Sequence, residues 1–163
     1  MKLKSSTPKY LIYGELGRFP IEIDIEIRMV SFWPILLLGK ETKLSYLSYK
    51  LLCTLSIEEN VHFVWIKYLK ELSDETGYSS IWINQDIPNS NWLISSIKLR
   101  LHDQCKKGWY SLIEHSPKAL NYRIFKENFE IENYCRILED KDIYTLCKFR
   151  TINHKLHMDT YAW

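Results

Sequence analysis

The sequence predicts an all-α protein, an irregular helical bundle of about seven helices. Turn-forming residues are scarce, with five Gly and five Pro among 163 residues, whereas all-β sandwiches usually need more of them. Apolar residues recur at three- and four-residue spacing along much of the chain, which is the helical period. The composition is globular, with 46% hydrophobic and 26% charged residues, and many large aromatic rings are available to fill a core.

The chain is expected to form one domain. Its length suits a single domain of ordinary size, and no repeat, low-complexity tract or dividing linker is visible. Residues 1–12 begin with a polar, basic stretch and are predicted to be a flexible N-terminal lead-in. The short piece Tyr10–Tyr13, where the lead-in meets the domain, fits a helix end or an extended strand. Residues 13–163 are predicted to form the single helical domain.

The segment that follows contains two glycines and is predicted to be a tight turn. Gly14 and Gly17 bracket Glu15 and Leu16, and glycine frees the backbone where a turn requires it. Pro20 suits the first turn of a helix, because its missing backbone N–H is not needed there. A helix is therefore expected to begin beside this proline.

Residues 21–27 carry conflicting signals. Isoleucine at each odd position alternates with a charged residue, which is a period of two and typical of a strand. Against this, the apolar pattern continues through residues 29–33 at helical spacing, and a strand of that length would be unusual. We predict a helix that ends or kinks around Pro34, with the strand as the alternative.

The next helix is predicted over residues 43–55. Thr42 or Ser45 is its expected cap, because either hydroxyl can accept a hydrogen bond from a free backbone N–H. Four leucines at helical spacing predict its buried face, which also has Tyr46 and Leu52 beside it. These leucines are Leu44, Leu47, Leu51 and Leu55.

A third helix is predicted to open at Glu58 and to stop at Gly77. Residues 78–88 are predicted to be irregular. Residues 89–91 are good caps for the longest helix, which is predicted to begin at Trp92. Its predicted buried side comprises Leu93, Ile97, Leu101, Trp109 and Leu112.

Pro117 is expected to end the long helix, because proline disfavours helical geometry in the residue before it. Three shorter helices are then predicted over residues 119–130, 132–138 and 140–153, with Asp140 as the cap of the last. The remaining residues up to Trp163 have no clear periodicity.

No catalytic, cofactor or metal site is predicted. Cys105 lies three residues from His102, but no orienting acid or oxyanion donor accompanies this pair. The acidic groups at residues 22–26 and 139–142 fit a helix surface and a helix start, where acids favour the dipole. The best zinc candidates lack the short fixed spacings of a zinc knuckle; they are Cys135, Cys147, His154 and His157.

The sequence predicts an intracellular protein, cytoplasmic or nuclear and not secreted. The four cysteines form no CxxC pair, so free thiols are expected. The N-terminus has no apolar signal-peptide core, and no apolar run is long enough to cross a bilayer. No membrane partner is therefore expected.

Basic side chains form the most suggestive clusters. Lysine and arginine that follow phosphates, with rings available for stacking, suit contact with RNA or DNA. The alternative is a solvated helix face, and the formal net charge of only +2 leaves the two readings evenly balanced. The candidate nucleic-acid-binding residues are Lys98, Arg100, Lys106, Lys107, Trp109, Lys148 and Arg150.

Several motifs together resemble a known family. YGELGRFP at residues 13–20, LHDQ at 101–104 and KFRTINHKL at 148–156 resemble the region that follows the polymerase domain in reverse transcriptases of non-LTR (LINE-like) retrotransposons. The resemblance runs from Tyr13 to Trp163 through moderately specific motifs, none of them catalytic. The family's Gly-Arg-Trp and following zinc knuckle are not matched, and the polymerase Asp-Asp pair is absent.

The resemblance implies a non-catalytic helical module derived from such a reverse transcriptase, which helps to hold nucleic acid. Its implied partners are RNA or DNA and the missing polymerase portion of the parent protein. Self-association is also expected, because the polymerase would normally cover the apolar stretch Tyr13–Trp33. The alternative is a helical protein-interaction or scaffold domain that binds no nucleic acid.

Overall fold

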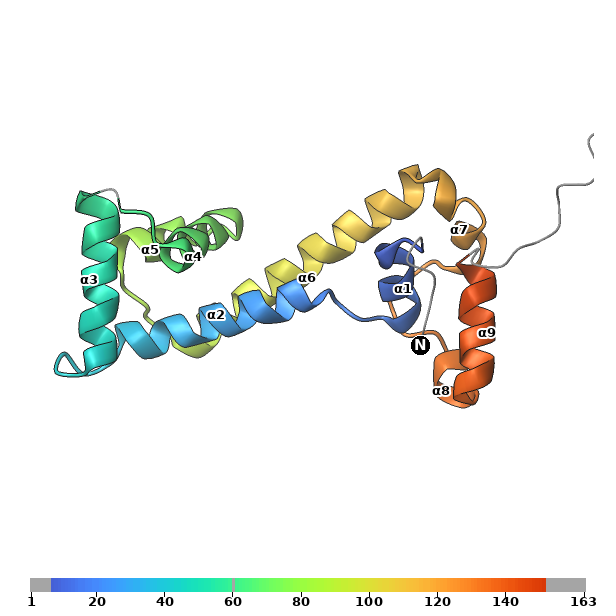
Figure 1. The fold of residues 1–163 in the computed structure, drawn as a ribbon, viewed down its shortest axis with the longest axis horizontal. Helices are drawn as coiled ribbons and strands as arrows, with labels where there is room; N and C mark the ends of the chain where they lie inside the picture. Colours follow the sequence, from blue (N-terminus) through green and yellow to red (C-terminus); the bar gives the residue numbers. More distant parts are fainter. Residues whose placement is uncertain (1–6, 60, 152–163) are drawn as a thin grey trace, which may run out of the picture. The chain divides into compact units, whose positions relative to one another are not determined.

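The computed structural model describes residues 7–59 and 61–151, and over these residues the protein is all-α, as predicted (Figure 1). No strand occurs in the described part. Residues 154–163, with the zinc candidates His154 and His157, lie outside it. The elements are α1 Lys9–Leu16, α2 Ile21–Leu37, α3 Leu44–Glu58, α4 Val64–Glu75, α5 Ser79–Asn84, α6 Ser90–His115, the 3-10 turn η1 Pro117–Ala119, α7 Tyr122–Phe125, α8 Tyr134–Ile137 and α9 Asp140–Arg150.

Contacts group the chain into two compact units. Unit 1 comprises Met1–Pro20 and Gln104–Trp163, and unit 2 comprises Ile21–Asp103. The sequence predicts one domain over residues 13–163, and this stays a prediction. One boundary between the units falls inside the continuous helix α6, where no linker composition can mark it. Residues 9–12, assigned by the sequence to a flexible lead-in, form the first part of α1.

Helix α1 packs in unit 1 through a close approach at Gly14. A Cβ atom at Gly14 would lie 2.6 Å from Trp109 Nε1 and 2.8 Å from the Tyr122 hydroxyl, so a larger residue would displace these rings. The chain turns only at Gly17, whose φ of 56° lies in the left-handed region. The predicted turn therefore starts too early. The core of this unit comprises Leu11, Trp109, Ile113, Ala119, Tyr122 and Phe129.

Helix α2 resolves the conflict over residues 21–27 in favour of a helix. Val30 and Trp33 are buried on its inner side, and burial of such large side chains outweighs the β-branched preference of the isoleucines. Pro34 lies inside the helix near its end and does not terminate it. Ile21 is 62% exposed and Ile25 is 51% exposed, so no element of unit 2 covers them.

Three helices supply most of the core of unit 2. A chain of two hydrogen bonds also connects its elements. Trp33 Nε1 donates to the Tyr49 hydroxyl at 2.9 Å in a buried bond, and this hydroxyl donates to the partly buried Gln85 Oε1 at 2.5 Å. The core side chains are Val30, Trp33 and Leu36 from α2, Ile66, Leu69 and Leu72 from α4, and Leu93, Ile97 and Leu101 from α6.

The predicted buried face of α3 is wrong. Its inner side is formed by Tyr46 and Tyr49, which are 9% and 3% exposed. The leucine stripe lies on the opposite side, with Leu44 79%, Leu47 51% and Leu51 59% exposed. Aromatic rings bury more area than leucine, so the tyrosines are favoured for the core. Neither predicted cap is used: the N-cap is Lys43, without a side-chain hydrogen bond.

The elements between α3 and α6 also differ from the prediction. The third helix was expected to open at Glu58, but α3 extends to this residue and α4 begins only at Val64. Gly77 follows α4 with a φ of 77°, as expected for a stop. Residues 79–84, predicted to be irregular, form α5 around the buried Trp82.

Helix α6 begins near the predicted place. The backbone N–H of Trp92 donates to Asn89 Oδ1 at 3.0 Å, which confirms Asn89 as a capping side chain. The predicted buried side is correct except at Leu112, which is 50% exposed, whereas the adjacent Ile113 is 5% exposed. The helix ends at His115, immediately before Ser116-Pro117 as expected.

The C-terminal helices are shorter than predicted. The segment expected to be one helix over residues 119–130 contains only η1 and α7, and α8 has four residues. Short polar runs with few apolar positions favour such single turns, because helix nucleation is costly. Helix α9 has Glu139 rather than Asp140 as its N-cap, and Asp140 is its first residue.

Candidate functional site

Trp109 packs in the core of unit 1. The ring is 4% exposed and its Nε1 donates to the Tyr10 carbonyl at 2.9 Å. The rings of Tyr110 and Phe129 pack against it with centroid distances of 4.9 Å and 5.3 Å. Stacking of a nucleic-acid base on this ring would require it to leave the core.

The two candidate arginines also have internal partners. The Arg100 guanidinium donates to the Thr76 carbonyl at the end of α4 and lies 4.7 Å from the centroid of the Tyr78 ring. Arg150 is ion-paired to Glu15 in unit 1. Both cations therefore stabilise their own unit and have limited freedom to contact phosphate.

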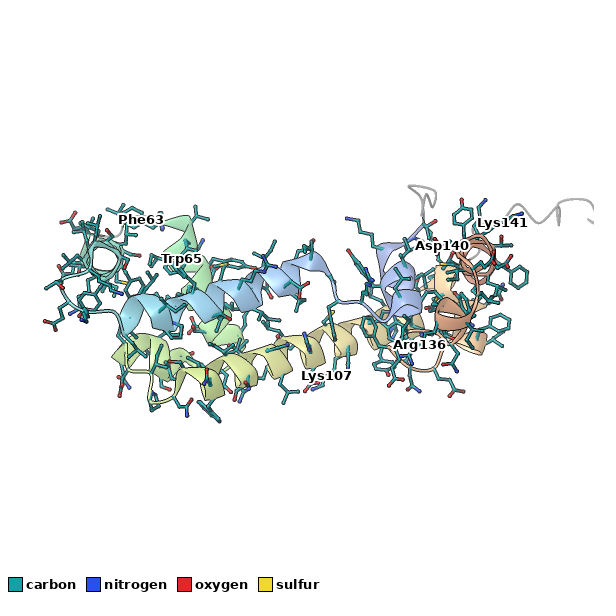
Figure 2. The ribbon with its side chains drawn as sticks, turned by 90° about the horizontal axis from the view of Figure 1, so that it is seen from below. Phe63, Trp65, Lys107, Arg136, Asp140 and Lys141 are labelled. Carbon is teal, nitrogen blue, oxygen red and sulfur yellow. The ribbon has the colours of Figure 1, made fainter. Side chains whose placement is uncertain are left out.

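The candidate lysines have fewer internal contacts than Trp109 and the two arginines. Lys98 and Lys107 are exposed, Lys106 is partly exposed, and none of the three forms an ion pair within the described residues. Figure 2 labels Lys107 on α6. Lys148 lies 5.1 Å from the centroid of the Tyr144 ring on the preceding turn of α9. Such a ring contact leaves the charge of a lysine intact.

Positive charge is concentrated in one unit. Counted on the sequence, unit 1 has 14 Lys and Arg against 9 Asp and Glu, a formal net charge of +5. Unit 2 has 8 against 11, a formal net charge of −3. The overall value of +2 thus conceals two units of opposite sign. Lys106, Lys107 and Lys148 belong to the basic unit, whereas Lys98 and Arg100 belong to the acidic one.

A buried ion-pair network forms the centre of unit 1. Arg150 Nε lies 3.1 Å from Glu15 Oε1, and its NH1 atom lies 3.4 Å from Glu132 Oε2. Lys126 Nζ lies 2.6 Å from Glu132 Oε1, and the Tyr134 hydroxyl donates to Glu15 Oε2. The Glu15 side chain is fully buried. Two cations thereby compensate two carboxylates. Such pairing is needed because an unpaired buried charge is strongly destabilising.

The network changes the acidity of neighbouring groups. Burial, assisted by the negative charge of Glu15, raises the pKa of Tyr122 and of Tyr134, so both hydroxyls stay protonated. The same two causes raise the pKa of the Cys147 thiol to about 12. Burial also raises the pKa of Cys135. A reactive thiolate is not favoured at either cysteine, because nucleophilic cysteines need a lowered pKa.

Metal binding finds no support in the part of the chain that is described. Within residues 7–59 and 61–151, no group of three or more His, Cys, Asp and Glu side chains is arranged to hold an ion. Cys135 and Cys147 both lie in unit 1 with free thiols. The two histidines considered with them as zinc ligands lie beyond the described residues.

The sequence did not reveal the network. Glu15 was assigned to a turn, and its partners Tyr134 and Arg150 lie 119 and 135 residues further along the chain. One signal was available, because Glu15 follows Leu11 by four residues and therefore shares its helix face. An acid on the inner face of a helix predicts a buried cation from elsewhere.

Each unit also has an apolar hollow. In unit 2, a groove of about 480 Å³ lies between α2, α3 and Trp65, a residue that Figure 2 labels. The groove is lined by Phe32, Leu36, Ser45, Ser48, Tyr49, Leu52 and Trp65. In unit 1, a cavity of about 410 Å³ lies beside α1 and the Trp109 ring; its walls are Pro8, Lys9, Tyr10, Tyr13, Pro20, Cys105, Gly108, Trp109, Leu112 and Phe129.

Comparison with known proteins adds no relative. No protein-family model, curated protein or solved structure matches the chain. Over the described residues, none of the helices has the length and apolar character needed to span a bilayer.

Proposed function

We propose that the chain is a non-catalytic helical module that contacts nucleic acid through unit 1. The observation that carries the proposal is the formal net charge of +5 on this unit, because clustered positive charge is the electrostatic signature of phosphate binding. Lys106 and Lys107 are the leading contacts, since neither has an ion-pair partner within the described residues. Lys148 is a further contact from α9.

The proposed set of contacts is smaller than the set of candidates from the sequence. Trp109 and Arg150 are assigned to the core and the ion-pair network of unit 1 rather than to binding. Lys98 and Arg100 are secondary, because they lie in the unit with a net charge of −3. Tyr10 and Tyr13 line the cavity in unit 1 and are half-buried, but both pack against the core that contains Trp109, so the proposed contacts are with phosphate through the lysines.

We propose further that the module derives from a non-LTR retrotransposon reverse transcriptase. Support comes from the sequence alone, in the motifs YGELGRFP and KFRTINHKL. The first motif has a structural role in this chain, because it contains Gly14, Glu15 and Gly17. A polymerase-type reading frame upstream and a cysteine-histidine knuckle downstream in the genomic sequence would establish this origin, and unrelated flanking frames would refute it.

The binding proposal is tested by titrating the protein into labelled structured RNA and labelled duplex DNA at several salt concentrations. Affinity is expected to fall as salt rises, because binding releases counterions from phosphate. The double variant Lys106→Ala/Lys107→Ala should bind more weakly and reduce the slope of log affinity against log salt by about one per lost phosphate contact.

A matched control removes two lysines that already have partners. Lys67 and Lys70 are exposed on α4 and pair with Glu71 and Asp74 at 3.7 Å and 3.9 Å, so Lys67→Ala/Lys70→Ala should leave the slope unchanged. Equal losses in both double variants would show a non-specific charge effect. Absence of binding at low salt would favour the protein-interaction or scaffold function.

A further inference from the structure

We propose that unit 2 binds a second copy of this chain, with the outward leucine face of α3 packed antiparallel against the same face of the partner copy. This self-association does not depend on nucleic-acid binding, because it uses the other unit. The starting observation is that α3 is apolar on two opposite sides. Tyr46 and Tyr49 face the core, and Leu44, Leu47 and Leu51 face outward with more than half of each side chain exposed.

The outward leucines form a continuous stripe. Residues three and four apart lie on one helix face, so Leu44, Leu47, Leu51 and the partly exposed Leu55 follow one another along α3. No element of unit 2 covers the first three. An exposed row of this kind is typical of a helix that packs against another helix.

Charges at the ends of α3 indicate that the partner is a second copy in antiparallel orientation. Lys43 precedes the helix, and Glu58 and Glu59 stand at its C-terminal end, all exposed. With a twofold axis at Leu51, residue 43 of one copy faces residue 59 of the other. Lysine then meets glutamate at both ends of the contact, whereas a parallel pair would place like charges together.

The same charges are unfavourable for an isolated helix. A helix N-terminus carries partial positive charge and a C-terminus partial negative charge, so Lys43 and the two glutamates each stand at the wrong end of α3. An antiparallel partner compensates both ends, because it brings glutamates to the N-terminus and a lysine to the C-terminus. It also sets Leu47 of one copy against Leu55 of the other.

The experiment is sedimentation equilibrium of the full chain over a range of micromolar concentrations. A reversible monomer–dimer equilibrium is expected. Leu51→Glu brings two carboxylates together at the axis and should raise the dimer dissociation constant at least about 100-fold, with unchanged far-UV circular dichroism because Leu51 is exposed. The matched control is Ile83→Glu on α5, at a position that is 74% exposed, and it should leave the dimer intact.

A charge exchange tests the orientation. Lys43→Glu and Glu59→Lys should each weaken the dimer, and the double variant should restore it, because opposite charges again face one another at both ends. A chain that stays monomeric overturns the proposal, as does a dimer that tolerates Leu51→Glu. Failure of the double variant to restore the dimer overturns the antiparallel arrangement. The variant Lys106→Ala/Lys107→Ala should dimerise normally, so this proposal and that of nucleic-acid binding fail separately.

Discussion

Replacement of Arg150 by methionine provides the sharpest test of the buried network in unit 1. Methionine keeps most of the aliphatic volume but removes the guanidinium. Two ion pairs are lost, with Glu15 at 3.1 Å and with Glu132 at 3.4 Å, together with the hydrogen bond donated to the Phe125 carbonyl at 2.8 Å. The contacts of the guanidinium with the Phe125 and Tyr134 rings are lost as well. Lys126 still compensates Glu132, whereas Glu15 keeps no cation.

The expected loss of stability follows from the burial of Glu15. Removing one partner of a buried pair costs about 3–5 kcal/mol, because the other charge stays uncompensated away from water. Glu15 is fully buried, but the Arg150 side chain is 15% exposed and therefore partly screened. We expect the lower end, about 3 kcal/mol, which corresponds to roughly a 100-fold change in an opening equilibrium.

Hydrogen exchange followed by mass spectrometry measures this change in each unit separately. Amides of α1 should exchange roughly 100-fold faster in Arg150→Met, because their protection depends on the stability of unit 1. Amides around Leu69 in α4 provide an internal reference within unit 2. The matched control is Arg136→Met, since Arg136 is an exposed arginine on α8, labelled in Figure 2.

A double-mutant cycle isolates the pair itself. Glu15→Gln removes the charge but keeps an acceptor for the Tyr134 hydroxyl, so the variant Glu15→Gln/Arg150→Met should lose less stability than the two single variants combined. If exchange in α1 rises less than threefold in Arg150→Met, or if the two losses simply add, the network does not stabilise unit 1 in the way described.

Three further outcomes are expected. Gly108→Ala should raise the melting temperature, because an added Cβ meets no atom within 4 Å and alanine favours a helix interior by about 1 kcal/mol relative to glycine. Gly14→Ala should lower the melting temperature, because its Cβ would clash with Trp109 and Tyr122. Shifts of the same sign in the two variants would contradict this packing. Tyr49→Phe should lower the stability of unit 2 by about 1–3 kcal/mol in urea titration, because the Trp33 indole N–H loses its buried acceptor; an unchanged midpoint would refute this. Folding raises the pKa of the Cys147 thiol from 9.0 to about 12, so the native state holds this proton more tightly than the unfolded state. The contribution of the thiol to the free energy of unfolding is therefore fully present below pH 9 and is lost as the pH rises to 12. Denaturant titrations over this pH range should therefore show a shallower decline for Cys147→Ala than for the wild type, and parallel declines would exclude the thiol as a cause.

The fold class could be predicted because helical periodicity and scarce turn residues are local properties. The orientation of α3 could not. Leucine spacing identified one apolar face, but the opposite face holds Tyr46 and Tyr49, and a helix that is apolar on both sides does not reveal which side meets the core. The choice depends on the shape of the site formed by α2 and α4, which a single helix does not encode.

The candidate site was predictable only in part. Exposed lysines such as Lys107 can be recognised from charge on a polar helix face. The position of Arg150 depends on partners far away in the sequence, and an arginine among polar residues gives no local sign of burial. Helical spacing did predict that Trp109 is buried, and a buried ring is a poor choice for a binding residue. The opposite net charges of the two units were also hidden, because unit 1 combines both ends of the chain.

The interleaving of the units has a consequence for biosynthesis. The ribosome completes unit 2 as one continuous segment, whereas unit 1 begins with α1 and needs residues up to Arg150. Glu15 emerges 135 residues before Arg150, an interval of roughly 7–27 s at translation rates of about 5–20 residues per second. During this time the carboxylate of α1 has no cation partner and stays in water. The unit that starts first therefore finishes last, and a nascent chain released before α9 would carry a folded unit 2 with an unfinished unit 1.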